Sequence, residues 1–222
     1  MNTKEIITKK RRFIKRSFLF SLLCLVSWIN ILSAASADYK SGDIVFVAKS
    51  GSAFESAIVG VTQTEKRDSF SHNGLINVTD SGVYVIEATP GGGVVYTPID
   101  IFVEKNVKEN IYRARLQPIY ERYIPEAIEY ACSLLGKKYD FAFDLENDQY
   151  YCSELIYVAF ANASKDAAFF ELPPMTFKDP ATNDFLPYWI DYYKKLETPI
   201  PEGKSGLNPN GMSLSDKLIW IQ

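Results

Sequence analysis

Apolar and polar residues alternate over the first half of the chain in the pattern of short β-strands. The predicted strands cover 44–47, 71–78, 83–88, 94–96 and 110–116. The turn residues Asp80-Ser81-Gly82 separate the second strand from the third, which predicts a hairpin. A short helix is expected over residues 54–62, between the first two strands.

Apolar residues recur at helical spacing in the second half of the chain. The predicted helices cover 125–135, 152–162 and 188–196. Gly136 is the stop signal of the first helix, and residues 140–150 form an irregular, aromatic loop. Because the strands come first and the helices follow, the pattern predicts an α+β fold with an antiparallel sheet.

The N-terminus has the pattern of a signal peptide. Basic residues between Lys9 and Arg16 precede an apolar run over 17–32, which ends at the small residues Ala35-Ser36-Ala37. We therefore expect residues 1–37 to be removed, and the mature protein to be exported to the periplasm or the extracellular space. An uncleaved membrane anchor is the alternative, although the run is shorter than the ~20 residues that span a bilayer.

The rest of the chain is expected to form one domain over residues 38–222. Residues 164–222 are rich in Pro, Asn, Asp and Gly and show little periodicity, so they are expected to be a less regular extension. No further apolar run is long enough to cross a membrane after signal cleavage.

Composition narrows the function classes. About half of the 222 residues are apolar (47%), which is typical of a packed globular protein, and the net charge of −3 argues against a nucleic-acid binder. A single histidine and the two cysteines outside the apolar N-terminal run are too few for a usual zinc site. No cofactor is expected.

Cys152 and His72 are the candidate nucleophile and base. Cys152 begins a predicted helix, where free backbone N–H groups and the helix dipole favour a thiolate and can hold an oxyanion. His72 is the only histidine, so any Cys–His pair must use it. Two ordinary alternatives stay open: a lone histidine is more often a surface or core residue, and Cys152 of an exported protein could pair with Cys132.

Glu87 is the candidate third member. It interrupts the apolar strand 83–88, which pairs with the strand that carries His72. A carboxylate there could accept a hydrogen bond from His72 and fix its tautomer. From the residues alone, the alternative that Glu87 lies on the solvated face of an edge strand is equally well supported.

Five short motifs occur in an order that resembles a known family. The order resembles the circularly permuted, YiiX-like branch of the NlpC-type papain-like cysteine peptidases, in the superfamily of the lecithin-retinol acyltransferases. In that branch the histidine strand precedes the cysteine helix. The motifs are Gly42-Asp43-Ile44-Val45-Phe46, Ser71-His72-Asn73-Gly74-Leu75-Ile76, Val85-Ile86-Glu87-Ala88, Gly136-x-x-Tyr139-Asp140 and Tyr151-Cys152-Ser153-Glu154-Leu155.

The resemblance implies a circularly permuted papain-like fold, with an antiparallel sheet or small barrel packed against helices. It also implies Cys152 as nucleophile, His72 as base and Glu87 as the residue that orients His72. Candidate oxyanion or substrate contacts are Tyr39, Tyr151 and Ser153. Tyr151 stands where non-permuted relatives usually have Asp.

The function expected from these features is cysteine hydrolysis of an amide bond through a thioester, by a peptidase or amidase, with an acyltransferase as the alternative. The expected partner is a substrate in the cell envelope, either a cell-wall peptide or an N-acyl or lipid amide, and not a nucleic acid. The competing readings are a catalytically silent lipid- or peptide-binding module on the same fold, and a structural envelope protein in which Cys152 is simply buried.

Overall fold

A computed structural model describes residues 39–48, 51–62, 64, 68–107 and 110–221. The expected signal peptide, residues 1–37, lies outside the described residues. By its internal contacts the chain divides into two units, Met1–Tyr39 and Lys40–Gln222, and the elements below belong to the second unit. Within the described residues, no helix combines the length and the apolar composition needed to span a bilayer.

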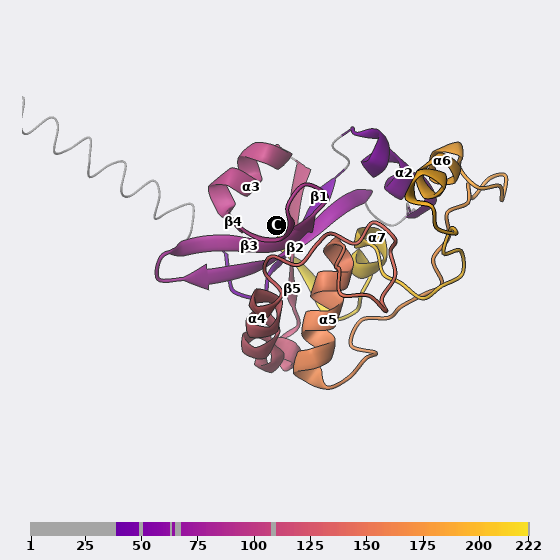
Figure 1. Cartoon of the computed structure of the whole chain (residues 1–222). Coiled ribbons are helices and arrows are strands. Elements are labelled where there is room, and N and C mark those ends of the chain that lie inside the picture. Colours follow the sequence, from indigo (N-terminus) through magenta and orange to yellow (C-terminus); the bar gives the residue numbers. More distant parts are fainter. Residues whose placement is uncertain (1–38, 49–50, 63, 65–67, 108–109, 222) are drawn as a thin grey trace, which may run out of the picture. The chain divides into compact units, whose positions relative to one another are not determined.

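The core of this unit is a six-stranded sheet in which every neighbouring pair is antiparallel (Figure 1). The strand order is β4-β3-β2-β1-β5-β6, so β4 and β6 are the edges of an open sheet. The strands are β1 (Ile44–Ala48), β2 (Phe70–Thr79), β3 (Gly82–Thr89), β4 (Gly93–Pro98), β5 (Ile111–Leu116) and β6 (Leu218–Ile221). The first five match the predicted strands, and the predicted hairpin is confirmed by the pairing of β2 with β3.

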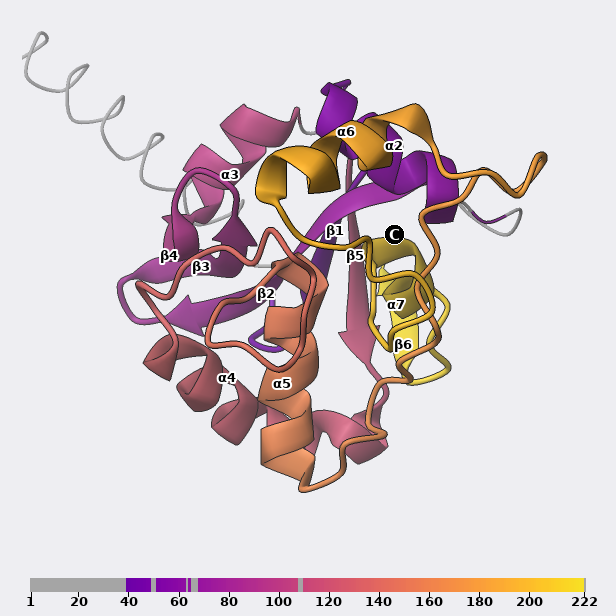
Figure 2. The same ribbon diagram turned by 45° about the vertical axis from the view of Figure 1, so that its right-hand side comes forward.

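Helices lie on both sides of the sheet: α3 is on one side, and α4 and α5 are on the other (Figures 1 and 2). The helices are α2 (Ala53–Thr62), α3 (Ile99–Asn106), the 3-10 helix η2 (Pro118–Tyr123), α4 (Ile124–Ser133), α5 (Cys152–Ser164), α6 (Pro187–Leu196) and α7 (Pro209–Ser213). The predicted helices correspond to α2, α4, α5 and α6. The predicted end of α4 at Leu135 is wrong, because the chain leaves the helix after Ser133 and then turns at Gly136, whose φ is +84°.

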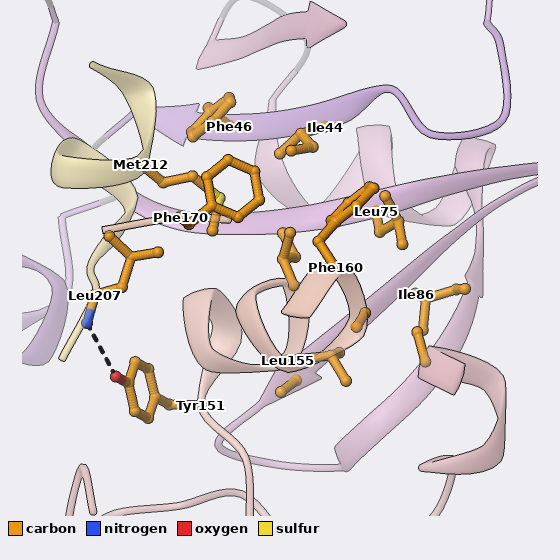
Figure 3. Packing of buried hydrophobic residues seen from close by; sticks show 14 of the residues in the cluster. Ile44, Phe46, Leu75, Ile86, Tyr151, Leu155, Phe160, Phe170, Leu207 and Met212 are labelled. Carbon is orange, nitrogen blue, oxygen red and sulfur yellow. Dashed lines mark hydrogen bonds between the residues drawn. The ribbon is translucent and has the colours of Figure 1, made fainter. Parts of the chain in front are cut away.

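Helix α5 is buried along most of its length and packs against β2 and β3. Leu155, Phe160, Leu75 and Ile86 belong to one buried cluster (Figure 3). Burying each such side chain contributes roughly 1.5–3 kcal/mol. This packing fixes the N-terminus of α5 relative to the sheet.

The Gly42-Asp43 motif has a structural role at the start of β1. The buried carboxylate of Asp43 accepts two hydrogen bonds from Arg115, at 2.6 and 2.8 Å, and one from the backbone N–H of Lys40 at 2.9 Å. Gly42 has a φ of +87°, and a Cβ there would lie 2.5 Å from the side chain of Ile124. The motif therefore joins β1 to β5 and to the start of α4.

Four elements of the described residues were not predicted: α3, η2, α7 and β6. Each is short, and three of them bury few side chains of their own. Residues 164–222 are more regular than expected, because they supply α6, α7 and the edge strand β6, which pairs with β5. Their order depends on partners far away in the sequence, which local patterns do not reveal.

Asn210 shows how this C-terminal segment joins the sheet. Its Oδ1 accepts a hydrogen bond from the N–H of Phe70 at 2.7 Å, and its Nδ2 donates to the carbonyl of Phe70 at 3.0 Å, across 140 residues of sequence. Nδ2 also donates to Thr62 Oγ1 at 2.8 Å. The buried amide thus completes the hydrogen bonding of the first residue of β2.

We expect Asn210→Ala to lower the free energy of unfolding by roughly 2–4 kcal/mol, since it leaves two buried backbone groups of Phe70 unpaired. Unfolding in urea measures this. Asn208→Ala is the matched control, because Asn208 accepts only from the N–H of Gly211 at the start of α7, and loss of such a cap costs ~1 kcal/mol. Equal losses in the two variants would contradict the role assigned to Asn210.

Candidate active site

Strand β2 presents His72 beside a β-bulge. Val47 pairs with His72 and Ala48 pairs with Phe70, so Ser71 is the extra residue of the bulge. Bulges commonly re-aim side chains next to functional sites. His72 is therefore presented by a local irregularity of β2, which the period-two pattern did not reveal.

Gly74 makes room for the neighbours of His72. A Cβ at this position would lie 2.4 Å from Val85 Cγ1 and 3.4 Å from Glu87 Cβ. The glycine of the Ser71-His72-Asn73-Gly74 motif thus lets β3 bring Glu87 close to the histidine. The requirement is steric and does not depend on a left-handed backbone.

The structure brings His72 and Glu87 into direct contact. His72 Nε2 lies 2.6 Å from Glu87 Oε2, and Thr97 Oγ1 donates to Glu87 Oε1 at 2.6 Å. The side chains of His72 and Glu87 are 17% and 5% exposed. Both carboxylate oxygens are therefore engaged, which fixes the orientation of the carboxylate and of the ring that it holds.

Cys152 is the first residue of α5 and is buried as a free thiol. Tyr151 before it has an extended backbone, and the side chain of Glu154 accepts the N–H of Tyr151 at 3.1 Å. A bridge between Tyr139 and Tyr150 closes the loop that precedes the helix. Asp140 shapes this loop by accepting the N–H groups of Ala142 and Asp144.

His72 lies between Cys152 and Glu87. Burial by itself lowers the pKa of His72, but hydrogen bonds to Cys152 and Glu87 and the charges of both groups raise the pKa to about 10. Since Nε2 faces Glu87, the other ring nitrogen, Nδ1, is the one left for Cys152. The ring is then a cation at neutral pH with an acidic group on each side.

The charge on Glu87 fits this arrangement. Burial raises the pKa of Glu87, but the hydrogen bond and charge of His72, the hydroxyl of Thr97 and the charge of Lys105 together lower it. The carboxylate therefore stays ionised and stabilises the imidazolium.

Glu154 behaves in the opposite way. Burial raises the pKa of Glu154 to about 9, despite its hydrogen bond from the backbone of Tyr151. The group is neutral at physiological pH, so it caps the helix without placing a negative charge beside Cys152.

A buried side-chain pair joins the residues that follow the histidine and the cysteine. Asn73 Nδ2 donates to Ser153 Oγ at 3.0 Å across 80 residues of sequence, and both side chains are fully buried. Asn73 Nδ2 also lies 3.4 Å from the sulfur of Met212, on α7. The pair connects β2 to the first turn of α5 one residue away from each candidate catalytic side chain.

Two cavities meet at the site. The first has a volume of about 270 Å³ and is lined by Cys152, Tyr139 and side chains of α2 and the C-terminal segment. The second has a volume of about 480 Å³ and is lined by His72, Glu87 and Tyr139. Tyr139 borders both cavities, and burial together with the charge of Cys152 raises its pKa well above the ordinary value, so its hydroxyl keeps its proton.

The other residues singled out in the sequence lie in different settings. The Tyr151 ring lines the first cavity, and its hydroxyl accepts the N–H of Leu207 at 3.2 Å (Figure 3). The Ser153 side chain is directed to Asn73 and lines neither cavity, although its backbone N–H belongs to the first turn of α5. Tyr39 is half-buried and belongs to the other unit of the chain, so its contact with substrate stays a prediction. Cys132 is a half-buried free thiol.

Sequence reasoning missed Asn73, Tyr139 and the C-terminal wall of the first cavity. Asn73 directly follows His72, and Tyr139 belongs to one of the five motifs, so their positions were the available signal. Nothing local marks residues 205–212 as part of the site. In the described part of the chain, no group of three or more His, Cys, Asp or Glu side chains is placed to hold a metal ion.

Comparison with known proteins agrees with this architecture. The sequence profile of the permuted papain-like amidase family, YaeF/YiiX, C92, matches residues 38–221. The chain is 30% identical over 142 residues to the protein YiiX of Escherichia coli K12, described as uncharacterized, and the match covers 64% of this chain and 67% of YiiX. The crystal structure of metalloprotein YiiX from Escherichia coli O157:H7 has the same fold, with a TM-score of 0.65 at 23% identity over 82% of this chain and 96% of that one.

The titration of His72 can be measured without ambiguity, because the chain contains one histidine. We expect its imidazole NMR signals to titrate with a pKa of about 10. Cys152→Ala should lower this pKa, and Glu87→Gln should lower it less, since the hydrogen bond to Cys152 is the largest of the contributions that raise it. A wild-type value near the ordinary ~6.5 would show that the ring is not held between two acidic groups.

The Asn73–Ser153 pair should position His72 and Cys152, the side chains that precede its two members in the sequence. We expect Asn73→Ala and Ser153→Ala each to slow the labelling of Cys152 by iodoacetamide, while the double variant slows it little further. The coupling between contacting residues is typically 0.5–3 kcal/mol. Ser164→Ala, which removes a hydroxyl at the far end of α5, is the control. Additive effects of the two substitutions would show that the pair does not act as a unit.

Proposed function

The chain belongs to the permuted papain-like amidase family, and on that premise we propose that it is an exported cysteine amidase that removes an acyl group from an N-acylated substrate. Cys152 is the nucleophile, His72 the acid and base, and Glu87 the residue that holds His72 in its charged form. The observation that carries this choice of substrate is the cavity beside Cys152.

This cavity suits an acyl chain better than a peptide. No Asp, Glu, Lys or Arg of the described chain lines it, and its walls are mostly apolar. The lining includes Ile58, Val61, Phe143, Pro173, Met175, Phe177, Trp189 and Leu207. Its volume of about 270 Å³ is near the lower end of the ~300–1,000 Å³ of small-molecule sites. An apolar chain gains free energy by leaving water here, whereas the polar backbone of a peptide would lose hydrogen bonds.

The geometry supports acyl transfer in two steps. The Cys152 thiolate attacks the amide carbonyl, and the free N–H groups of the first turn of α5 stabilise the resulting oxyanion. The Nδ1 proton of His72 passes to the leaving nitrogen as the C–N bond breaks, which leaves a thioester on Cys152. Water then attacks the thioester, gives a proton to His72 and releases the fatty acid and the thiolate.

The raised pKa of His72 has a consequence for this cycle. Its hydrogen bond to Cys152 is the largest contribution that raises the pKa. Once the sulfur has bonded to the carbonyl carbon, it carries no negative charge, so that contribution falls and the imidazolium becomes a stronger acid. The step that forms the S–C bond thus prepares His72 to protonate the leaving amine.

Export is supported by the N-terminal pattern of the sequence. The family profile starts to match at residue 38, directly after the expected cleavage position. An amidase delivered by this route would meet its substrate in the cell envelope.

The apolar cavity predicts a steep dependence on acyl length. For amides of one amine, we expect kcat/KM to rise roughly four-fold per added methylene until the cavity is filled, because each buried methylene contributes ~0.8 kcal/mol. Release of fatty acid or amine measures the rate. Cys152→Ala should abolish turnover, and Cys132→Ala should leave it unchanged.

Val61→Trp tests the cavity itself. The bulkier ring should shorten the acyl chain at which kcat/KM stops rising, while labelling of Cys152 by the small reagent iodoacetamide stays near the wild-type rate. A rate that does not depend on acyl length, together with cleavage of cell-wall peptides, would replace the acyl amide with a peptide as the substrate.

A further inference from the structure

The second cavity lies on the histidine side of the site and differs in character from the first. It is lined by His72, Glu87, the Pro90-Gly91-Gly92 turn and the end of α3, with a volume of about 480 Å³. In the proposed reaction, the acyl chain extends from the carbonyl into the first cavity. The amine must therefore lie on the side of His72, which protonates it.

Four charged side chains line this second cavity: Glu55, His72, Glu87 and Lys105. Glu87 is neutralised by His72 at 2.6 Å. Glu55 accepts the backbone N–H and the hydroxyl of Ser52 at the start of α2. Lys105, in the last turn of α3, lines the cavity, and no ion pair joins it to a carboxylate of the described residues. Its positive charge also acts on Glu87.

A hydroxyl without a partner belongs to the same wall. Ser71 Oγ is buried and has no hydrogen-bond partner within the described chain, and Ser71 lines the cavity. A buried polar group left unpaired costs free energy, so such groups often mark places where a ligand binds. The wall thus offers one cation that makes no ion pair within the described residues and one buried hydroxyl without a partner there, close to His72.

We propose that this second cavity binds the leaving amine of the substrate, and that Lys105 selects amines that carry an anionic group. Two sources of that anion share this chemistry: the carboxylate of an amino acid and the phosphate of a lipid headgroup. The inference rests on the proposed function for its position in the reaction, but the anion site itself can be tested without turnover.

The test without turnover uses two alkylating reagents of similar size. Iodoacetate is anionic and iodoacetamide is neutral, both alkylate cysteine thiolates, and the rate is measured at Cys152. Lys105→Glu should lower the iodoacetate-to-iodoacetamide rate ratio on the order of ten-fold at low ionic strength, and added salt should shrink the effect. Lys194→Glu makes the same charge change on α6, outside both cavities, and should leave the ratio unchanged. Equal ratios in the wild type and Lys105→Glu would overturn the proposal.

The turnover test compares three amides with one acyl chain: N-acylglycine, N-acylphosphoethanolamine and neutral N-acylethanolamine. The wild type should prefer an anionic amine, and Lys105→Glu should raise KM for the anionic amides about ten-fold relative to the neutral one. Preference for glycine or for phosphoethanolamine identifies the source of the anion. Equal use of all three amides would overturn the inference while leaving the amidase intact. A lower iodoacetate-to-iodoacetamide rate ratio in Lys105→Glu, without cleavage of any amide by the wild type, would support the anion site and refute the proposed function.

Discussion

The site depends on one proton held in a buried place. An imidazolium inside a protein is unfavourable, because burial removes the water that would solvate it. Here the ring of His72 has an ionised carboxylate on Nε2 and the thiol group of Cys152 on its other side, and these two neighbours outweigh the loss of water. Thr97 and Gly74 matter because they let Glu87 reach the ring in a fixed orientation.

Holding this proton requires two distant parts of the chain to keep a fixed separation. Cys152 is carried by α5 and His72 by β2, and the two elements are joined directly by the Asn73–Ser153 hydrogen bond. The C-terminal segment supports both of them, since Asn210 pairs with the first residue of β2 and Leu207 donates to the hydroxyl of Tyr151. Residues 205–213 are therefore part of the frame of the site as well as a wall of its first cavity.

The two cavities divide the proposed substrate at the bond that breaks. The apolar side, with Trp189 and Phe177, fits the acyl group, and the side with Lys105 and Ser71 fits the amine. Tyr139 lies at the boundary with a hydroxyl that stays protonated. This division also fits the proposed chemistry, because Cys152, the proposed nucleophile, lines the acyl cavity and His72, the proposed proton donor, lines the amine cavity.

The sequence by itself determined the α+β class, five of the six strands, the start of α5 at Cys152 and the pairing of His72 with Glu87 as candidates. These features are local: side chains alternate along a strand and recur along a helix, and a lone histidine leaves one choice of base. Only the tertiary structure decided the bulge at Ser71, the strand β6, the Asn73–Ser153 link and the cavity walls around Cys152. Each of these depends on atoms brought together from positions far apart in the chain, and no local spacing of residues records such contacts.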